Sequence, residues 1–182
     1  MYRTPLMAAV ALSLAGCGLT HVEEDPDSPY YKISEGAVLE LRQPVDIPPG
    51  STRMWFVRGQ VVPGRDWYAT SCSLEINTLD RTGIQTVEPD RFEVTRVQLT
   101  SDNMATQAPP VHVAATGGQF YPVVEQNWIW SGYHLWLDSA EQPDVRRLSC
   151  KGVFGAPKDA LPPSINAIRA ALGDHATLHQ AQ

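Results

Sequence analysis

Short runs of alternating apolar and polar residues, separated by proline and glycine, constrain the fold of this chain more than any other feature. Ala37, Leu39 and Leu41 are each separated by a single residue, and this period of two is typical of a strand with one buried face. Proline and glycine follow at 48–50 and 63–66. These residues favour turns, because proline fixes φ and glycine permits positive φ. The pattern therefore predicts short antiparallel strands joined by tight turns.

The same pattern recurs along most of the chain and changes only near its end. We expect further strands at 52–60, 67–76, 85–89, 92–99, 133–137 and 145–153. Ile165, Ile168 and Leu172 are then spaced three and four residues apart, as on one side of a helix. Ser164 suits the N-cap, and Gly173 suits the position just past the helix end. We expect a mainly β fold, an antiparallel sandwich or partly open barrel of roughly seven to nine strands, with one C-terminal helix at about 164–172.

Residues 1–16 have the layout of a secretory signal peptide. Arg3 is the only charge among the first twenty residues, and the apolar run Leu6–Leu14 is shorter than the roughly 20 residues that a membrane-spanning helix needs. Small residues then precede Cys17, as at a cleavage site. The tetrapeptide Leu14-Ala15-Gly16-Cys17 resembles the lipobox of bacterial lipoproteins, which implies cleavage before Cys17 and acylation of its thiol and its new amine. Two alternatives stay open: an ordinary signal peptide beside a chance cysteine, and a buried N-terminal helix.

Residues 17–36 are expected to connect this lipid anchor to a β domain at 37–182. The segment Glu23–Pro29 is acidic, broken by proline and without periodicity, so it cannot bury enough apolar surface to offset its ordering entropy. We expect a flexible tether here. In the lipoproteins that carry a lipobox, Asp after the cysteine favours the inner membrane. Gly18 therefore implies the outer membrane, with the periplasmic face favoured over the cell surface.

The charge balance narrows the range of partners. The formal net charge is −6, and the absence of a basic stripe argues against nucleic acid as a partner. The expected partners are the lipid bilayer, through acylated Cys17, and an envelope protein or glycan.

Cys72 and Cys150 are expected to form a structural disulfide. Export places them where disulfides persist, and both lie in strand-like runs, with Cys72 on the same face as Leu74 and Ile76. The alternative is a redox or nucleophilic thiol, which needs a lowered pKa and usually a partner histidine. No C-x-x-C is present, and no histidine lies near either cysteine in the sequence. The local sequence also lacks the four ligands of a zinc site, and we expect neither a metal nor a cofactor.

Several segments resemble a family of uncharacterised proteobacterial lipoproteins. They are Ile47–Gly50, Cys72 before its strand, Gln85–Val97, Gln142–Cys150 and Ile168–Gly173. The resemblance covers most of residues 37–100 and 133–173. It implies an anchored Cys17 and a Cys72–Cys150 pair, and it implies no activity.

Three tryptophans are the best candidates for a binding site. Trp128 and Trp130 are two residues apart and share a face if the segment is a strand, and Trp136 follows in the next expected strand. They could form an aromatic platform for a sugar ring or a protein partner, since tryptophan is enriched at interface hot spots. The alternative, which we favour, is that they fill the core of a small β domain. The nearby segment 101–119 is rich in turn residues and is expected to be a long loop with a functional or disordered character.

The histidines are scattered and no catalytic motif accompanies them. The sequence contains no nucleophile elbow, P-loop or H-E-x-x-H. His134 lies in an alternating strand, where it is solvent-facing or satisfied within the sheet. His21 lies in the tether, and His175 and His179 lie in what we expect to be a polar tail. We expect no catalytic residue and no enzyme.

Two groups of charged residues are further candidates for a functional role. Glu88 and Asp90 are neighbouring acids, and glycosidases use two carboxyl groups about 5–10 Å apart; the alternative is a solvated turn. The second group either forms an ion-pair network or consists of solvated strand ends: Asp90, Arg91, Arg96, Arg146 and Arg147.

Taken together, the sequence predicts an outer-membrane lipoprotein that acts as a non-catalytic binding or assembly accessory. A periplasmic inhibitor or immunity lipoprotein is one alternative, because such proteins commonly use a small disulfide-bonded β domain. An envelope enzyme whose site is assembled from distant loops is the other, and it would require a concave pocket with converging polar groups.

Overall fold

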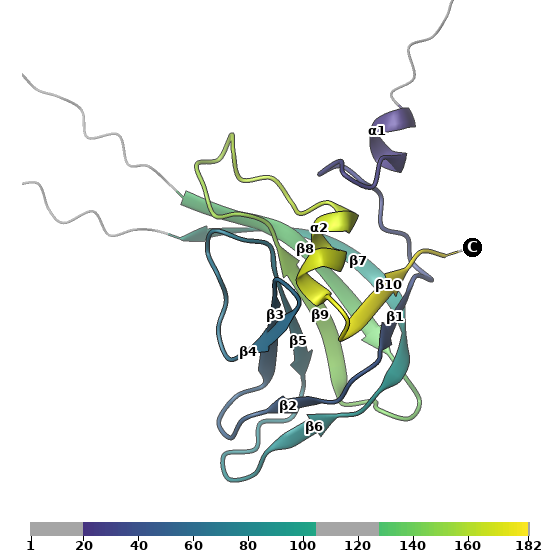
Figure 1. Ribbon diagram of the computed structural model, residues 1–182, viewed down its shortest axis with the longest axis vertical. Coiled ribbons are helices and arrows are strands. Elements are labelled where there is room, and N and C mark those ends of the chain that lie inside the picture. The colour runs from purple at the N-terminus through teal and green to yellow at the C-terminus, as the bar shows by residue number, and fades with distance from the viewer. Residues whose placement is uncertain (1–19, 105–127, 182) are drawn as a thin grey trace, which may run out of the picture.

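The computed structural model describes residues 20–104 and 128–181 (Figure 1). Its strands are mainly antiparallel and form a curled sheet, a half-barrel, with a short helix near the C-terminus. The predicted mainly β fold, an antiparallel sandwich or partly open barrel with one C-terminal helix, is confirmed.

The described residues contain ten strands and two helices. The strands are β1 (Val38–Leu41), β2 (Val45–Ile47), β3 (Arg53–Val57), β4 (Gln60–Val62), β5 (Ser71–Ile76), β6 (Gln85–Val87), β7 (Asp90–Met104), β8 (Trp128–Asp138), β9 (Val145–Lys151) and β10 (Ala176–His179). The helices are α1 (Thr20–Glu24) and α2 (Ile165–Leu172). Eight strands form one sheet in the order β10-β1-β7-β8-β9-β5-β3-β4, and β2 pairs with β6 in a second sheet. The barrel stays open because β10 and β4 stand at opposite edges of the large sheet.

The inner face of the sheet and α2 enclose the main core. Alternate residues point inward, as the period of two predicts; in β5 they are Cys72, Leu74 and Ile76. The Ser164 hydroxyl caps α2 by accepting a hydrogen bond from the backbone N–H of Ala167 at 3.1 Å. Gly173 follows the last turn with a φ of 57°, a conformation that favours glycine.

A second, smaller cluster lies on the opposite face of the same sheet. Phe56 of β3 belongs to the main core, whereas its neighbours Trp55 and Val57 are buried together with Trp130 in the second cluster. Met54 and Phe56 alternate with Trp55 and Val57 in the sequence, and this alternation predicts the division of the side chains between the two faces. The sheet therefore buries apolar side chains on both faces, but only over part of its outer one.

The C-terminal residues differ from the expected polar tail. Residues Ala176–His179 form β10, which pairs antiparallel with β1. Ala176 and Leu178 are buried, and His179 Nε2 lies 2.8 Å from Glu40 Oε2. Four residues with two apolar side chains are too short a run to be distinguished from a tail by periodicity.

Part of the segment expected to be a tether packs on the β domain. Ile33 is buried in the main core, Ser28 is buried, and the backbone N–H of Asn166 donates to the Pro26 carbonyl at 3.1 Å. The acidic composition of the segment did not predict these contacts, because each contact depends on a single side chain or a single backbone group.

The structure describes only a small part of the segments predicted to be a signal peptide, a lipid anchor and a long loop. Residues 101–104 continue β7 instead of starting a loop, and the rest of the segment expected to be a loop lies outside the described residues. Cys17 and the expected signal peptide also lie outside them. Among the helices that the structure describes, none has the length and apolar character that crossing a membrane requires.

Candidate functional site

The candidate site is the outer face of the sheet, by which we mean the side of β7, β8, β9, β5 and β3 that faces away from α2. Residues directly opposite each other on adjacent strands form continuous rows across these five strands. The rows are Thr100–Gly132–Lys151–Ser71–Val57, Gln98–His134–Ser149–Ser73–Trp55 and Arg96–Trp136–Arg147–Glu75–Arg53. Polar and charged side chains dominate the rows, and several of them are buried although they face away from the core.

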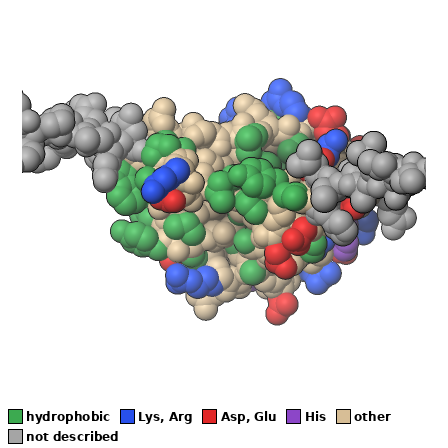
Figure 2. Space-filling view, turned by 90° about the horizontal axis from the view of Figure 1, so that it is seen from above, with side chains coloured by type: hydrophobic (Ala, Val, Ile, Leu, Met, Phe, Trp, Pro, Cys, Tyr) green, Lys and Arg blue, Asp and Glu red, His purple; other side chains and the backbone are tan. Residues whose placement is uncertain are grey.

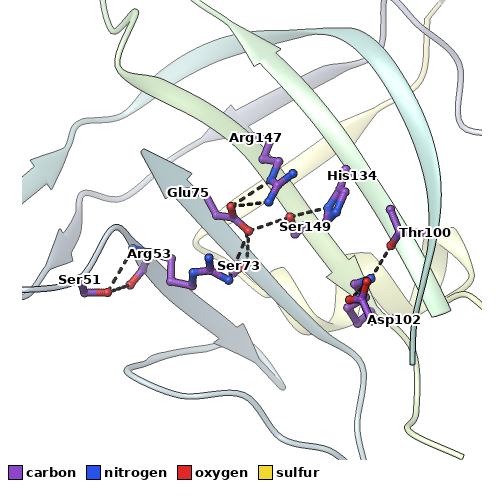
Figure 3. A network of polar contacts seen from close by, with 10 residues as sticks. Ser51, Arg53, Ser73, Glu75, Thr100, Asp102, His134, Arg147 and Ser149 are labelled. Carbon is purple, nitrogen blue, oxygen red and sulfur yellow. Dashed lines mark hydrogen bonds and ion pairs between the residues drawn. The ribbon is translucent and has the colours of Figure 1, made fainter. Parts of the chain in front are cut away.

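Glu75 is the most enclosed acid of this face. Its side chain is 5% exposed and pairs with Arg147 at 2.9 Å and with Arg53 at 3.7 Å (Figure 3). The Ser149 and Ser73 hydroxyls donate to Glu75 Oε1 at 2.9 and 3.2 Å. Burial alone raises the pKa of Glu75, but the Ser149 hydroxyl and the two guanidiniums outweigh it and hold the pKa below its ordinary value. Glu75 is therefore a charged anchor for neighbouring strands.

Ser149 connects Glu75 to His134. His134 Nδ1 lies 2.7 Å from the Ser149 oxygen, and Ser149 donates its own proton to Glu75. Burial, reinforced by Arg147 and Lys151, lowers the pKa of His134 to about 4, so the ring is neutral at pH 7. Because the Ser149 proton is directed to Glu75, the Ser149 oxygen accepts from the ring, which assigns the proton to Nδ1.

This order of groups differs from that of a catalytic triad. In a triad the histidine lies between serine and acid and accepts the serine proton. Here the serine lies in the middle and its proton is held by the carboxylate. The arrangement fixes the positions of β5, β9 and β8 relative to one another.

Lys151 reaches across a neighbouring strand. Its ammonium group lies 2.8 Å from Asp102 Oδ2, and its side chain is only 4% exposed; the ammonium also donates to the Thr100 hydroxyl. Both partners are on β7, whereas Lys151 is on β9. The lysine passes over Gly132 of β8, where an added Cβ would lie 2.8 Å from Lys151 Cδ. A glycine at this position makes the crossing sterically possible.

Trp136 lies at the other end of the outer face, among three guanidiniums. The Cζ atoms of Arg96, Arg146 and Arg147 lie 4.2, 5.1 and 5.3 Å from its ring centroid. Arg96 and Arg146 are exposed, and the indole is half-buried. Its Nε1–H points to Gln98 Oε1 at 3.4 Å. Aromatic rings attract guanidinium groups through the negative potential of the ring face, so the indole holds these cations at the surface.

The three predicted tryptophans share a face but do not form one platform. Trp128, Trp130 and Trp136 belong to the single strand β8, and at roughly 3.3 Å per residue Trp136 stands about 20 Å from Trp130. Trp130 is 3% exposed, stacks on Trp55 and donates its Nε1–H to the Gly152 carbonyl at 2.6 Å. Trp128 is half-buried and stacks on Phe154.

Arg65 covers the buried tryptophan cluster from the solvent side. Its guanidinium lies 3.7 Å from the Trp67 centroid and 4.9 Å from the Trp130 centroid. Burial lowers the pKa of this arginine, and Arg53 adds to the effect. The outer face thus has a covered aromatic half around Trp130 and an open cationic half around Trp136.

A different exposed surface lies between β9 and α2. This segment is at the top of Figure 1, and hydrophobic side chains gather in the middle of the face seen from above in Figure 2. Val153 and Leu161 of the segment are 49% and 41% exposed. Lys158 and Asp159 of the same segment are exposed as well, so this surface combines apolar side chains with one charge of each sign.

The predicted charged network does not form as a unit. Asp90 accepts hydrogen bonds from the Ser139 hydroxyl at 2.6 Å and from Gln142 at 3.2 Å, and the Ser139 hydroxyl lowers the pKa of Asp90. Arg91 lies 3.9 Å from Glu40, whereas Arg147 binds Glu75 and Arg96 lies over Trp136. Glu88 is exposed, and its backbone N–H and carbonyl bond to the Gln142 side chain.

The structure contains the expected disulfide between Cys72 and Cys150. The two cysteines are directly opposite each other on β5 and β9. No group of three or more His, Cys, Asp or Glu in the described part of the chain is arranged to hold a metal ion.

Sequence reasoning missed Glu75, Ser149 and Lys151, although a signal for them was present. If Cys72 and Cys150 face each other on antiparallel strands, each step forward on one strand matches a step back on the other. That register places Ser73 opposite Ser149 and Glu75 opposite Arg147, as observed.

No family model matches this chain, and neither a curated protein nor a solved structure matches it.

Proposed function

We propose that this protein is a lipoprotein of the bacterial outer membrane that acts as a non-catalytic binding or assembly accessory for another envelope component. The observation that best supports binding is the open cationic half of the outer face, where Trp136 holds exposed Arg96 and Arg146. Tryptophan and arginine are the residues most enriched at interface hot spots. The proposed anchor is acylated Cys17, at the end of Leu14-Ala15-Gly16-Cys17.

The position of the proposed anchor bears on which way the domain faces. Cys17 precedes the start of α1 by three residues, which span at most about 11 Å. In Figure 1, α1 lies at the top and the turn between β8 and β9 lies in the lower half. Trp136 is near that turn, two residues before the end of β8. A membrane-bound Cys17 would therefore leave this end of the sheet facing away from the anchoring membrane.

The proposed anchor is tested by the intact mass of the protein purified from membranes. We expect a mass that corresponds to residues 17–182 plus acyl chains. The Cys17→Ser variant should lose the acyl mass and leave the membrane fraction. An unacylated mass for the unaltered chain would overturn the anchor.

The proposed binding role is tested by photo-crosslinking in cells. The full-length chain would carry p-benzoylphenylalanine at Gln98, beside Trp136, or at Lys158, which is exposed on the segment before α2. We expect a discrete adduct with one envelope component from position 98 and not from position 158. No adduct from either position, or the same adducts from both, would contradict a binding role for the outer face.

A further inference from the structure

We infer that Trp136, Arg96 and Arg146 form a docking site for an acidic protein surface. This inference rests on the proposed binding function and names the chemistry of the partner. The partner's carboxylates would pair with the two exposed guanidiniums, while the indole keeps both guanidiniums in place.

The strands on both sides of Trp136 change register next to it, and on the β9 side the extra residue is Arg146. The pairing of β7 with β8 shifts register between Val94 and Arg96, and the pairing of β5 with β9 shifts between Glu75 and Ile76. Each shift leaves one extra residue on one strand, as in a β-bulge, which re-aims side chains. Consecutive residues of a regular strand face opposite sides, yet Arg146 and Arg147 both lie near the Trp136 ring. The second bulge accounts for this.

The charges around the ring are not balanced within the chain. Arg147 is paired with Glu75 at 2.9 Å, but Arg96 and Arg146 have no carboxylate within ion-pair distance among the described residues. The exposed acids Glu93 and Asp138 face each other in the next row of β7 and β8, and neither pairs with these arginines. Two guanidiniums held at the surface of an acidic protein are complementary to carboxylates of a partner.

The side chains at this surface favour a protein over a glycan or a lipid headgroup. Protein interfaces are centred on tryptophan and arginine anchors with a polar rim. Arg96 and Arg147 flank the indole from the strands on either side of it, so the ring holds the cations instead of presenting an open face to a sugar.

The test uses the purified full-length chain and an octaglutamate peptide as the probe. Binding is followed through the indole N–H resonance of Trp136, assigned by its loss in Trp136→Phe. We expect the peptide to shift this resonance, and Arg96→Glu combined with Arg146→Glu to weaken the affinity at least about tenfold, because like charges then face each other. The matched control is Arg81→Glu with Lys158→Glu, which makes the same charge change at exposed sites elsewhere and should alter the affinity less than twofold.

Each remaining outcome overturns the inference. Equal loss of affinity in both double variants would show only a response to net charge. Tighter binding of polygalacturonate, or of phosphatidylglycerol vesicles, through the same resonance would identify a glycan or a lipid instead. In cells, a position-98 adduct that persists in the Arg96→Glu, Arg146→Glu chain would overturn this site and leave the proposed binding function intact.

Discussion

Lys151 and Asp102 form an ion pair of 2.8 Å across an intervening strand, and Gly132 of that strand is what makes the pair possible. An added Cβ at Gly132 would collide with the Cys150 carbonyl oxygen and lie 2.8 Å from Lys151 Cα and Cδ. We expect Gly132→Ala to lower the free energy of unfolding by about 3 kcal/mol, as overpacking does in rigid sites. Urea denaturation followed by tryptophan fluorescence measures the loss.

The control for this substitution is Gly64→Ala. No atom lies within 4 Å of a Cβ built at Gly64, so stability should change by less than about 0.5 kcal/mol. Similar destabilisation by the two substitutions would refute the steric account of Gly132.

His134 should make stability depend on pH in a defined window. Its pKa is about 4 in the folded protein and about 6.5 in an unfolded chain. Between these values the unfolded state binds more protons, so the stabilisation present above pH about 6.5 is lost as the pH falls toward 4. The ring is partly exposed, and solvent screening limits the effect to about 1 kcal/mol.

The measurement compares urea unfolding of the unaltered chain with His134→Gln from pH 7 to pH 4. Loss of stability over this range should be smaller in the variant. Carboxylates with lowered pKa values, such as Glu75 and Asp90, also reduce stability as they protonate, but they do so in both proteins. Parallel profiles for the two proteins would mean that His134 titrates alike in the folded and unfolded states.

The buried pair of Glu75 and Arg147 should show strong coupling. Glu75→Ala leaves Arg147, with its side chain 18% exposed, without its partner at 2.9 Å, and we expect a loss of about 3 kcal/mol. The double variant Glu75→Leu, Arg147→Met should lose less than the single variants Glu75→Leu and Arg147→Met combined, because it leaves no buried charge behind. Additive losses would contradict this. Arg91→Ala serves as the exposed control and should change stability little.

The disulfide should contribute a large share of stability. Cys72 and Cys150 are 78 residues apart in the sequence, and closing a loop of that size restricts the unfolded chain by about 4 kcal/mol. We expect Cys72→Ala with Cys150→Ala to lower the urea midpoint clearly. Adding reductant should lower the midpoint of the unaltered chain to a similar value and leave the double variant unchanged. An unaltered chain that is indifferent to reductant would contradict the prediction.

The spacing of apolar residues and the capping residues predicted which faces of the strands are buried and where α2 lies. The alternation at 54–57 assigned faces correctly, and the Ser164 cap and the spacing of Ile165 and Ile168 located α2. The relation of distant strands was not predictable in this way, because no local pattern shows that β5 lies beside β9 or that β1 lies beside β10. The polar rows of the outer face depend on those pairings, so their residues looked like ordinary solvated positions.

The register shifts beside Trp136 could not be predicted from the sequence pattern either. Arg146 and Arg147 are adjacent in sequence, and regular alternation places them on opposite faces. Only the register shift after Glu75 allows both to approach the same indole. A single extra residue in one strand thus converts a solvated strand end into the most cationic part of the outer face.

The strand order also determines when this chain can fold as it is synthesised. β1 is hydrogen-bonded to β7 and β10, and β5 to β3 and β9, so each of these two early strands has one partner that is made much later. Before residues 145–151 appear, β5 has only the hairpin of β3 and β4 to pair with, and β1 gains its second neighbour only from residues 176–179. Pairings between distant segments make folding slow. The hairpins of the first half can form early, but the large sheet is complete only once residues 176–179 have been made.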